Sequence, residues 1–175
     1  MLSACSDFDG GGNGASDTPS ATEAIYSGTW WVNDKQSIDA DVKVRSDAFF
    51  FNRMPYEDIL TLLFPGKKIT MVSDEGYVVP FEMKAYTDRT YLYAINPTGW
   101  EFVADIDGKE CSVGIMFSPV YNVNTGSWGS YSRQNGVFTL FLRATSLTCS
   151  GIYGPDAGAV PVDLKLKFTS ATPKK

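Results

Sequence analysis

Apolar and polar residues alternate along most of the chain from Tyr26 onward. Residues 38–44 and 162–168 place an apolar side chain at every second position, with charged or polar residues between them. A period of two puts alternate side chains on opposite faces of a β-strand, so it predicts strands with one buried face. About ten strands are predicted, at residues 26–32, 38–44, 49–51, 67–72, 77–85, 90–95, 100–106, 109–117, 137–147 and 162–168.

One predicted hairpin specifies its own register. Asp107-Gly108 is typical of a two-residue turn in which both residues have positive φ. Such a turn places Ala104 opposite Cys111. Nearly all apolar side chains between positions 100 and 117 then lie on one face of the hairpin, with Val103 as the main exception. A shift of one residue would bury acidic side chains instead. The pattern therefore predicts that Cys111 points inward.

One predicted helix interrupts the strands. Pro55 suits the first helical position, and Glu57 and Asp58 suit the positive end of the helix dipole. Phe64-Pro65-Gly66 then ends the helix. Its apolar residues follow the i, i+3, i+4, i+7 spacing of an amphipathic helix: Tyr56, Ile59, Leu60 and Leu63. We expect this helix to plug or cover an open end of a sheet, and a partner-binding helix is the alternative.

The predicted fold class is all-β, with about ten antiparallel strands and one short helix. Closure into a barrel removes both sheet edges, and a two-sheet sandwich is the alternative. Gly28-Thr29-Trp30 resembles the Gly-x-Trp motif of calycin and lipocalin barrels, in which the tryptophan packs across the closed end. This resemblance implies a calycin-like antiparallel β-barrel. In that family the helix follows the last strand, whereas here the predicted helix lies early.

The first 23 residues differ in composition from the rest of the chain. They are rich in Gly, Ser and Asp, and segments so poor in apolar residues cannot bury enough surface to become ordered. We therefore expect residues 1–23 to hold a lipobox remnant and a disordered tether. Residues 24–175 should form a single β domain, long enough to bury about two-thirds of its unfolded surface.

The segment Leu2-Ser3-Ala4-Cys5 resembles a bacterial lipobox, in which lipid is attached to the cysteine sulfur after cleavage. The resemblance implies that Cys5 is the lipid attachment site, and that the lipid anchors the protein to a membrane without a spanning segment. The apolar part of a signal peptide is then expected before Met1. An ordinary N-terminus with a chance cysteine is the alternative.

The order of lipobox, acidic and glycine-rich tether and single β domain resembles small envelope lipoproteins of Bacteroidetes bacteria, many of them uncharacterised. Two further segments carry this resemblance, Tyr26-x-Gly28-x-Trp30 and Phe50-x-x-Arg53-Met54-Pro55. The resemblance implies an outer membrane lipoprotein, at the cell surface or on the periplasmic face. The formal net charge of −5 and the absence of a basic stripe argue against nucleic acid as a partner.

Two cysteines remain besides Cys5. An envelope compartment permits a disulfide between Cys111 and Cys149. Strand parity, however, directs Cys149 outward while Cys111 points inward, which favours two separate thiols. A bulge within residues 145–148 would reverse the direction of Cys149 and leave the disulfide open.

The residue types present limit the chemistry of the domain. The chain has no histidine, which excludes the usual Ser-His-Asp and Cys-His nucleophile systems and imidazole metal sites. Two carboxylate pairs, Asp39 with Asp41 and Asp105 with Glu110, are predicted to face solvent, where nothing would keep an acid protonated for catalysis. We therefore expect a protein that is not an enzyme and has no cofactor or metal.

The best candidate for recognition is the segment of residues 118–135, which is long for a hairpin connection. Aromatic rings and amides together suit sugars or protein surfaces. The candidate ligand-binding residues are Tyr121, Asn124, Trp128, Tyr131 and Arg133. Alternatively, these rings fold back to cap the barrel. We expect binding of a glycan, a small apolar ligand or an envelope protein, or else a structural role in a surface complex without a small ligand.

Overall fold

The computed structural model describes residues 24–71, 76–118, 124–150 and 159–171. These ranges contain one helix, α1 (Tyr56–Leu63), and eleven strands. The strands are β1 (Ala24–Val32), β2 (Lys35–Val44), β3 (Ala48–Phe51), β4 (Ile69–Met71), β5 (Tyr77–Tyr86), β6 (Thr90–Ile95), β7 (Trp100–Ile106), β8 (Lys109–Phe117), β9 (Trp128–Ser132), β10 (Phe138–Cys149) and β11 (Val160–Ser170).

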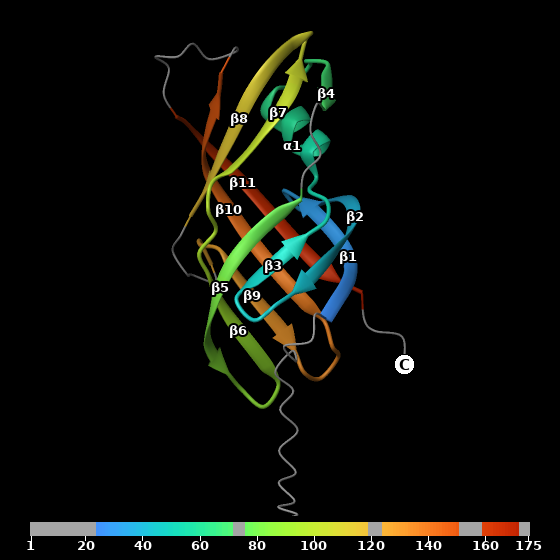
Figure 1. The fold of residues 1–175 in the computed structure, drawn as a ribbon, viewed down its shortest axis with the longest axis vertical. Helices are drawn as coiled ribbons and strands as arrows, with labels where there is room; N and C mark the ends of the chain where they lie inside the picture. Colours follow the sequence, from blue (N-terminus) through green and yellow to red (C-terminus); the bar gives the residue numbers. More distant parts are fainter. Residues whose placement is uncertain (1–23, 72–75, 119–123, 151–158, 172–175) are drawn as a thin grey trace, which may run out of the picture.

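Eight of these strands close into an antiparallel barrel (Figure 1). The strand order around it is β11-β1-β2-β3-β5-β6-β9-β10, and β10 pairs back onto β11. Each strand of the ring therefore has a paired neighbour on both sides, so the ring has no free edge strand. The all-β prediction is confirmed, and the fold is the barrel, not the two-sheet sandwich.

Strand β10 also carries an extension of the sheet. Residues 138–141 of β10 pair with β9, whereas residues 144–149 pair with β8. Strands β7 and β4 follow β8, so the order continues as β10-β8-β7-β4. Figure 1 shows β7 and β8 extending beyond the barrel, with α1 beside them. The outermost strand, β4, has only three residues, which limits the open edge that it presents.

The predicted β7–β8 hairpin has the expected register. Ala104 lies opposite Cys111, and the turn residues Asp107 and Gly108 have φ of 57° and 77°. The Cys111 side chain is buried. The inward prediction for Cys111 is therefore confirmed.

The predicted direction of Cys149 is wrong. The register of β10 shifts between Ala144 and Ser146, so that Thr145 is an extra residue against β8. This bulge reverses the parity of the rest of the strand, and Cys149 is only 3% exposed. Cys149 lies opposite Val113, two residues from Cys111 on the same face, and both cysteines are buried thiols.

The prediction of one long connection over residues 118–135 is also wrong, because residues 128–132 form β9. This strand pairs with β6 on one side and β10 on the other, which completes the barrel. The inward position between Trp128 and Tyr131 is Gly129, which has no apolar side chain. The alternation that identifies other strands is therefore hidden in β9.

Helix α1 covers the inner face of the extension. Tyr56, Ile59 and Leu60 are buried, and the Tyr56 ring lies 4.8 Å from Trp100 and 4.9 Å from Phe102, centroid to centroid. Pro55 precedes the helix instead of occupying its first position. The predicted helix is confirmed, and its buried side packs against β7 of the extension. Across the described ranges, no helix combines the length and apolar character needed to cross a membrane.

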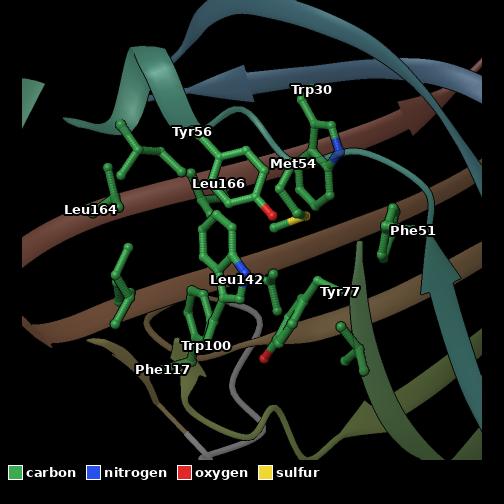
Figure 2. Close-up of a cluster of buried hydrophobic side chains, with 14 of the residues drawn as sticks. Trp30, Phe51, Met54, Tyr56, Tyr77, Trp100, Phe117, Leu142, Leu164 and Leu166 are labelled. Atoms are coloured by element: carbon green, nitrogen blue, oxygen red, sulfur yellow. The ribbon is translucent and has the colours of Figure 1, made fainter. Parts of the chain in front are cut away.

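Large side chains fill the barrel and the junction with the extension, as Figure 2 shows for part of this core. Trp30 is fully buried, packs against Phe51 and Phe168, and donates a hydrogen bond from Nε1 to the carbonyl oxygen of Arg53 at 3.1 Å. Phe49 and Phe138 are also fully buried, with ring centroids 4.7 Å apart. Because these side chains occupy the interior, a ligand site is expected on the outer surface of the barrel.

Candidate functional site

Four outward-facing side chains form a row across four neighbouring strands on the outside of the barrel. Trp128 of β9 lies opposite Phe141 of β10, which lies opposite Lys167 of β11, which lies opposite Trp31 of β1. We call these four residues the outer row. They come from three separate parts of the sequence and are aligned only by strand register.

The alternation within β10 and β11 explains why the outer row faces outward. Leu142 and Leu166 are fully buried and point into the core cluster in Figure 2. Successive side chains of a strand point to opposite faces, so Phe141 and Lys167 point away from the core. Both are half-buried, so parts of their side chains are open to solvent.

Ring contacts hold three of the four residues of the outer row in place. The Trp128 and Phe141 rings are stacked, with centroids 4.5 Å apart and planes at 24°. The Lys167 ammonium nitrogen lies 5.7 Å from the Phe141 centroid, within the range of a cation–π contact. Trp31, like Trp128, is half-buried. The row thus offers partly exposed aromatic rings with restricted side-chain freedom.

A groove of about 180 Å³ lies beside the outer row, and we call it the outer groove. The outer row contributes three aromatic residues and Lys167 to its lining. Four polar residues contribute its other lining: Asp34, Asn124, Arg143 and Lys165. Aromatic faces and hydrogen-bonding groups of both charges therefore meet in one concave surface.

The β1–β2 turn is fixed against β11 at one end of the outer groove. Asn33 and Asp34 have φ of 45° and 66°, the signature of a two-residue hairpin turn with both central residues left-handed. Asn33 Oδ1 accepts a hydrogen bond from the Lys165 backbone N–H at 2.8 Å, and the Asn33 N–H donates to the Lys165 carbonyl oxygen at 2.9 Å. These bonds position Asp34 at the groove.

The segment that precedes β9 is fixed against β10 at the other end. Ser127 is fully buried, and its Oγ accepts a hydrogen bond from the Arg143 backbone N–H at 3.0 Å. The Arg143 guanidinium forms an ion pair with Asp163 at 2.8 Å between Nη2 and Oδ1. Asn124 and Trp128 are thereby brought beside Arg143 at the groove.

The structure divides the predicted site residues between two places. Asn124 and Trp128 line the outer groove. Tyr131 points inward toward Tyr26, at 5.9 Å between ring centroids, and Arg133 lies over the Tyr91 ring, 5.5 Å from its centroid. Tyr121 lies outside the described residues. Trp128 and Tyr131 therefore belong to opposite faces of β9.

Tyr131 belongs to a group that we call the tyrosine cluster: Tyr26, Tyr91, Tyr93 and Tyr131. Burial and the neighbouring Tyr131 hydroxyl raise the pKa of Tyr26 to about 12. Burial also raises the pKa of Tyr93, whose hydroxyl has no hydrogen-bond partner. Tyr131 therefore packs within the barrel wall as a residue of strand β9, on the face opposite to the outer groove.

Several residues of the outer groove were not identified from the sequence. Trp31, Phe141 and Lys167 lie far apart along the chain, and only the pairing of β1, β11 and β10 aligns them. A partial signal was present. Adjacent residues of a strand face opposite sides, so one member of Trp30-Trp31 had to point outward.

Three of the four carboxylates considered as acids or bases accept hydrogen bonds from neighbouring groups. Asp39 accepts from Thr29 Oγ1 at 2.8 Å and Asp41 accepts from Ser27 Oγ at 2.6 Å, along a second, polar groove over β1 and β2. Asp105 accepts from the Gly108 backbone N–H at the β7–β8 turn. Within the described ranges, no group of three or more Cys, Asp or Glu side chains is placed to hold a metal ion.

Comparison with protein-family models, with characterised proteins and with solved structures finds no match to this chain. The closed eight-stranded antiparallel barrel is consistent with the calycin-like resemblance of Gly28-Thr29-Trp30. The outer groove therefore provides the main evidence for function.

Proposed function

We propose that this protein is a non-catalytic carbohydrate-binding protein of the bacterial cell envelope, and that the outer groove holds a sugar ring. The observation that supports this most strongly is the outer row, in which Trp128, Phe141 and Trp31 are aligned beside hydrogen-bonding side chains. A pyranose ring has an apolar C–H face and a rim of hydroxyl groups. Aromatic rings pack against the face, and amides and charged groups bond to the hydroxyls.

The size of the outer groove favours a sugar chain over an enclosed small molecule. Pockets that enclose a small ligand usually measure about 300 to 1,000 Å³. The outer groove, at about 180 Å³, is smaller and is close to the size of a single hexose ring. One residue of an oligosaccharide would lie in the groove while its neighbours continue along the barrel surface.

Preorganisation supports recognition at this site. The rings are held by stacking, and both ends of the groove are fixed by backbone hydrogen bonds of Lys165 and Arg143. A ligand would therefore order few side chains on binding. Binding is tighter when less conformational freedom is lost, which favours groups that are already fixed.

The envelope location is part of the proposal and rests on the lipobox resemblance of Leu2-Ser3-Ala4-Cys5. A lipid on Cys5 would anchor the protein at a membrane, with residues 6–23 of the chain between the anchor and the barrel. Mass spectrometry of the native protein should find acyl chains on Cys5. An unmodified Cys5 on a cytosolic protein would contradict this location.

The binding proposal is tested with a panel of purified oligosaccharides, followed by tryptophan fluorescence and titration calorimetry. We expect at least one oligosaccharide to bind the protein, and we expect Trp128→Ala and Trp31→Ala each to weaken that binding at least tenfold. Each change removes ring surface from the groove. If no member of the panel binds, the proposal is wrong.

The matched control is Phe50→Ala. Phe50 is also a half-buried outward ring beside a cation, with the Arg45 guanidinium 4.5 Å from its centroid, but it lies on β3, outside the groove. We expect this variant to bind like the unmodified protein. Equal weakening by Phe50→Ala and Trp128→Ala would show that the groove is not the site.

A second candidate function is a structural component of a surface complex, and one observation favours it. Ile25 of β1, Lys43 of β2, Phe50 of β3 and Val78 of β5 are successive partners in register, with Ile25 65% and Val78 42% exposed. This exposed apolar row could contact another envelope protein. The complex should then survive Trp128→Ala and be lost in Phe50→Ala, as measured by cross-linking and co-purification from native membranes.

A further inference from the structure

We propose that the sugar held in the outer groove carries a negatively charged group, either a carboxylate or a sulfate. This inference rests on the proposed function and specifies the ligand class. It is argued from the balance of charges around the groove. Three cationic side chains line the groove, Arg143, Lys165 and Lys167, against the single carboxylate of Asp34.

The two lysines are the uncompensated charges. The Arg143 guanidinium is already paired with Asp163 at 2.8 Å. Within the part of the chain that the structure describes, neither Lys165 nor Lys167 forms an ion pair. Both ammonium groups are therefore available to a ligand.

The positions of the lysines allow both to reach one ligand. Lys165 and Lys167 are two residues apart on β11, so their side chains leave the same face of the strand about 7 Å apart at the backbone. Two flexible lysine side chains can converge over this distance on one acidic group. The positive charge of these two lysines is opposite in sign to the formal net charge of the chain, which is −5.

The aromatic side of the groove determines what kind of anion fits. Lys167 lies between Phe141 and Trp31 in the outer row, and its ammonium group is 5.7 Å from the Phe141 ring centroid. An anion bound to this ammonium therefore lies beside aromatic surface. A small inorganic anion would leave that surface unused, whereas an acidic sugar places its charge on the lysines and its ring face against Trp31 or Trp128.

Asp34 restricts the arrangement further. Its carboxylate lines the same groove and would repel a second negative charge placed near the β1–β2 turn. It can instead accept a hydrogen bond from a sugar hydroxyl. The groove thus suits one acidic group at the lysines and neutral hydroxyls near Asp34.

The test compares charged oligosaccharides with neutral counterparts of the same linkage by titration calorimetry. One pair is a uronic acid oligosaccharide and its carboxyl-reduced form, and the other is a sulfated oligosaccharide and its desulfated form. We expect the charged member of at least one pair to bind at least tenfold more tightly at low ionic strength. The difference should shrink as salt is added, because exposed charges are screened.

The variant Lys165→Gln combined with Lys167→Gln should bind the charged oligosaccharide no more tightly than its neutral counterpart, so that the ratio of the two affinities falls from at least tenfold to about one. Lys43→Gln is the matched control, since Lys43 also lies next to an aromatic residue, Phe50, in an outward row. Thermal melting establishes that both variants are folded. Retained preference for charge in the double variant would overturn the inference.

The two proposals fail in different ways. Equal binding of charged and neutral oligosaccharides would overturn the acidic ligand and leave carbohydrate binding intact. If the protein binds none of the four oligosaccharides and no glycan of the wider panel, the proposal of carbohydrate binding itself is wrong. Binding of free sulfate or acetate as tightly as the acidic sugar would show that the lysines bind anions without recognising a sugar.

Discussion

Trp30 and Trp31 are adjacent in sequence and lie on opposite sides of the barrel wall. Trp30 is fully buried and donates its indole N–H to the Arg53 carbonyl oxygen, whereas Trp31 lies half-buried in the outer row. The pleat of β1 separates a residue that stabilises the fold from one that lines the proposed site. The two roles can therefore be tested independently.

Replacing each of these tryptophans with alanine should have different effects on stability. Trp30→Ala leaves a cavity beside Phe51 and Phe168, and we expect it to lower the free energy of unfolding by about 3 to 5 kcal/mol. Trp31→Ala should change it by less than about 1 kcal/mol, because that ring is already partly in water. Urea unfolding followed by circular dichroism measures both. A larger loss for Trp31→Ala would contradict this assignment.

Gly28 is required by the close approach of β1 to β11. A Cβ atom at this position would lie 2.4 Å from the Thr169 carbonyl oxygen and 2.6 Å from the Ser170 Cα atom, both of which are backbone. Gly28→Ala must separate the two strands, and we expect it to cost about 2 to 3 kcal/mol.

The control for this change is Gly129→Ala in β9. A Cβ atom there would have its nearest neighbours at 3.5 Å, an ordinary van der Waals distance. We expect its unfolding free energy to stay within about 1 kcal/mol of the unmodified protein. Chemical denaturation of the pair should give a clear difference, and equal stability of both variants would contradict the close approach.

Removing the hydroxyl groups of two buried tyrosines should change the free energy of unfolding in opposite directions. The Tyr93 hydroxyl has no partner, so Tyr93→Phe removes an unsatisfied polar group and should raise the unfolding free energy by about 1 kcal/mol. The Tyr77 hydroxyl donates to the Thr98 carbonyl oxygen at 2.6 Å, and Tyr77→Phe should lower it by about 1 kcal/mol. In thermal melting, we expect Tyr93→Phe to unfold at a higher temperature than the unmodified protein and Tyr77→Phe at a lower one. The reverse order would refute this reading of Tyr93.

Alkaline pH should destabilise the fold through tyrosine ionisation. Burial raises the pKa of Tyr26 from 10.0 to about 12, and it also raises the pKa values of Tyr77 and Tyr93. At a pH between the unfolded and the folded pKa of a tyrosine, the unfolded chain has lost a proton that the folded chain keeps. Stability therefore falls as the pH rises through this range. The contribution is fully present below about pH 10 and is lost as pH passes the folded value.

A spectrophotometric titration of tyrosinate absorbance tests this behaviour. A subset of the tyrosines should ionise late, and unfolding in denaturant should abolish the delay. Tyr26→Phe should remove part of the late phase. A native titration that matches the denatured one would contradict the burial of these hydroxyls.

The features predicted correctly from sequence depend on residues close together in the chain. The β7–β8 hairpin is specified by Asp107-Gly108 and by the alternation on either side of it. Helix α1 is specified by the apolar spacing from Tyr56 to Leu63 and by the residues that end it. Local signals of this kind determine single elements, and they identified most of the strands of the barrel.

The features that the sequence did not reveal depend on contacts between distant strands or on one extra residue. Strand β9 lacks an apolar side chain at Gly129, so it becomes visible only through its pairing with β6 and β10. The outer row requires β9, β10, β11 and β1 to be in register. Trp128 and Asn124 were predicted as site residues from their types, but their partners in the groove could not be.

The extra residue in β10 has a consequence for the chemistry of sulfur in this protein. Without this bulge, regular alternation through the same residues would bury Ser146 and Thr148 and would turn Leu147 and Cys149 toward water. A thiol on that face could be oxidised or could cross-link two copies of the chain. The one extra residue in β10 therefore keeps the Cys149 thiol in the core, out of contact with oxidants and with other copies of the chain.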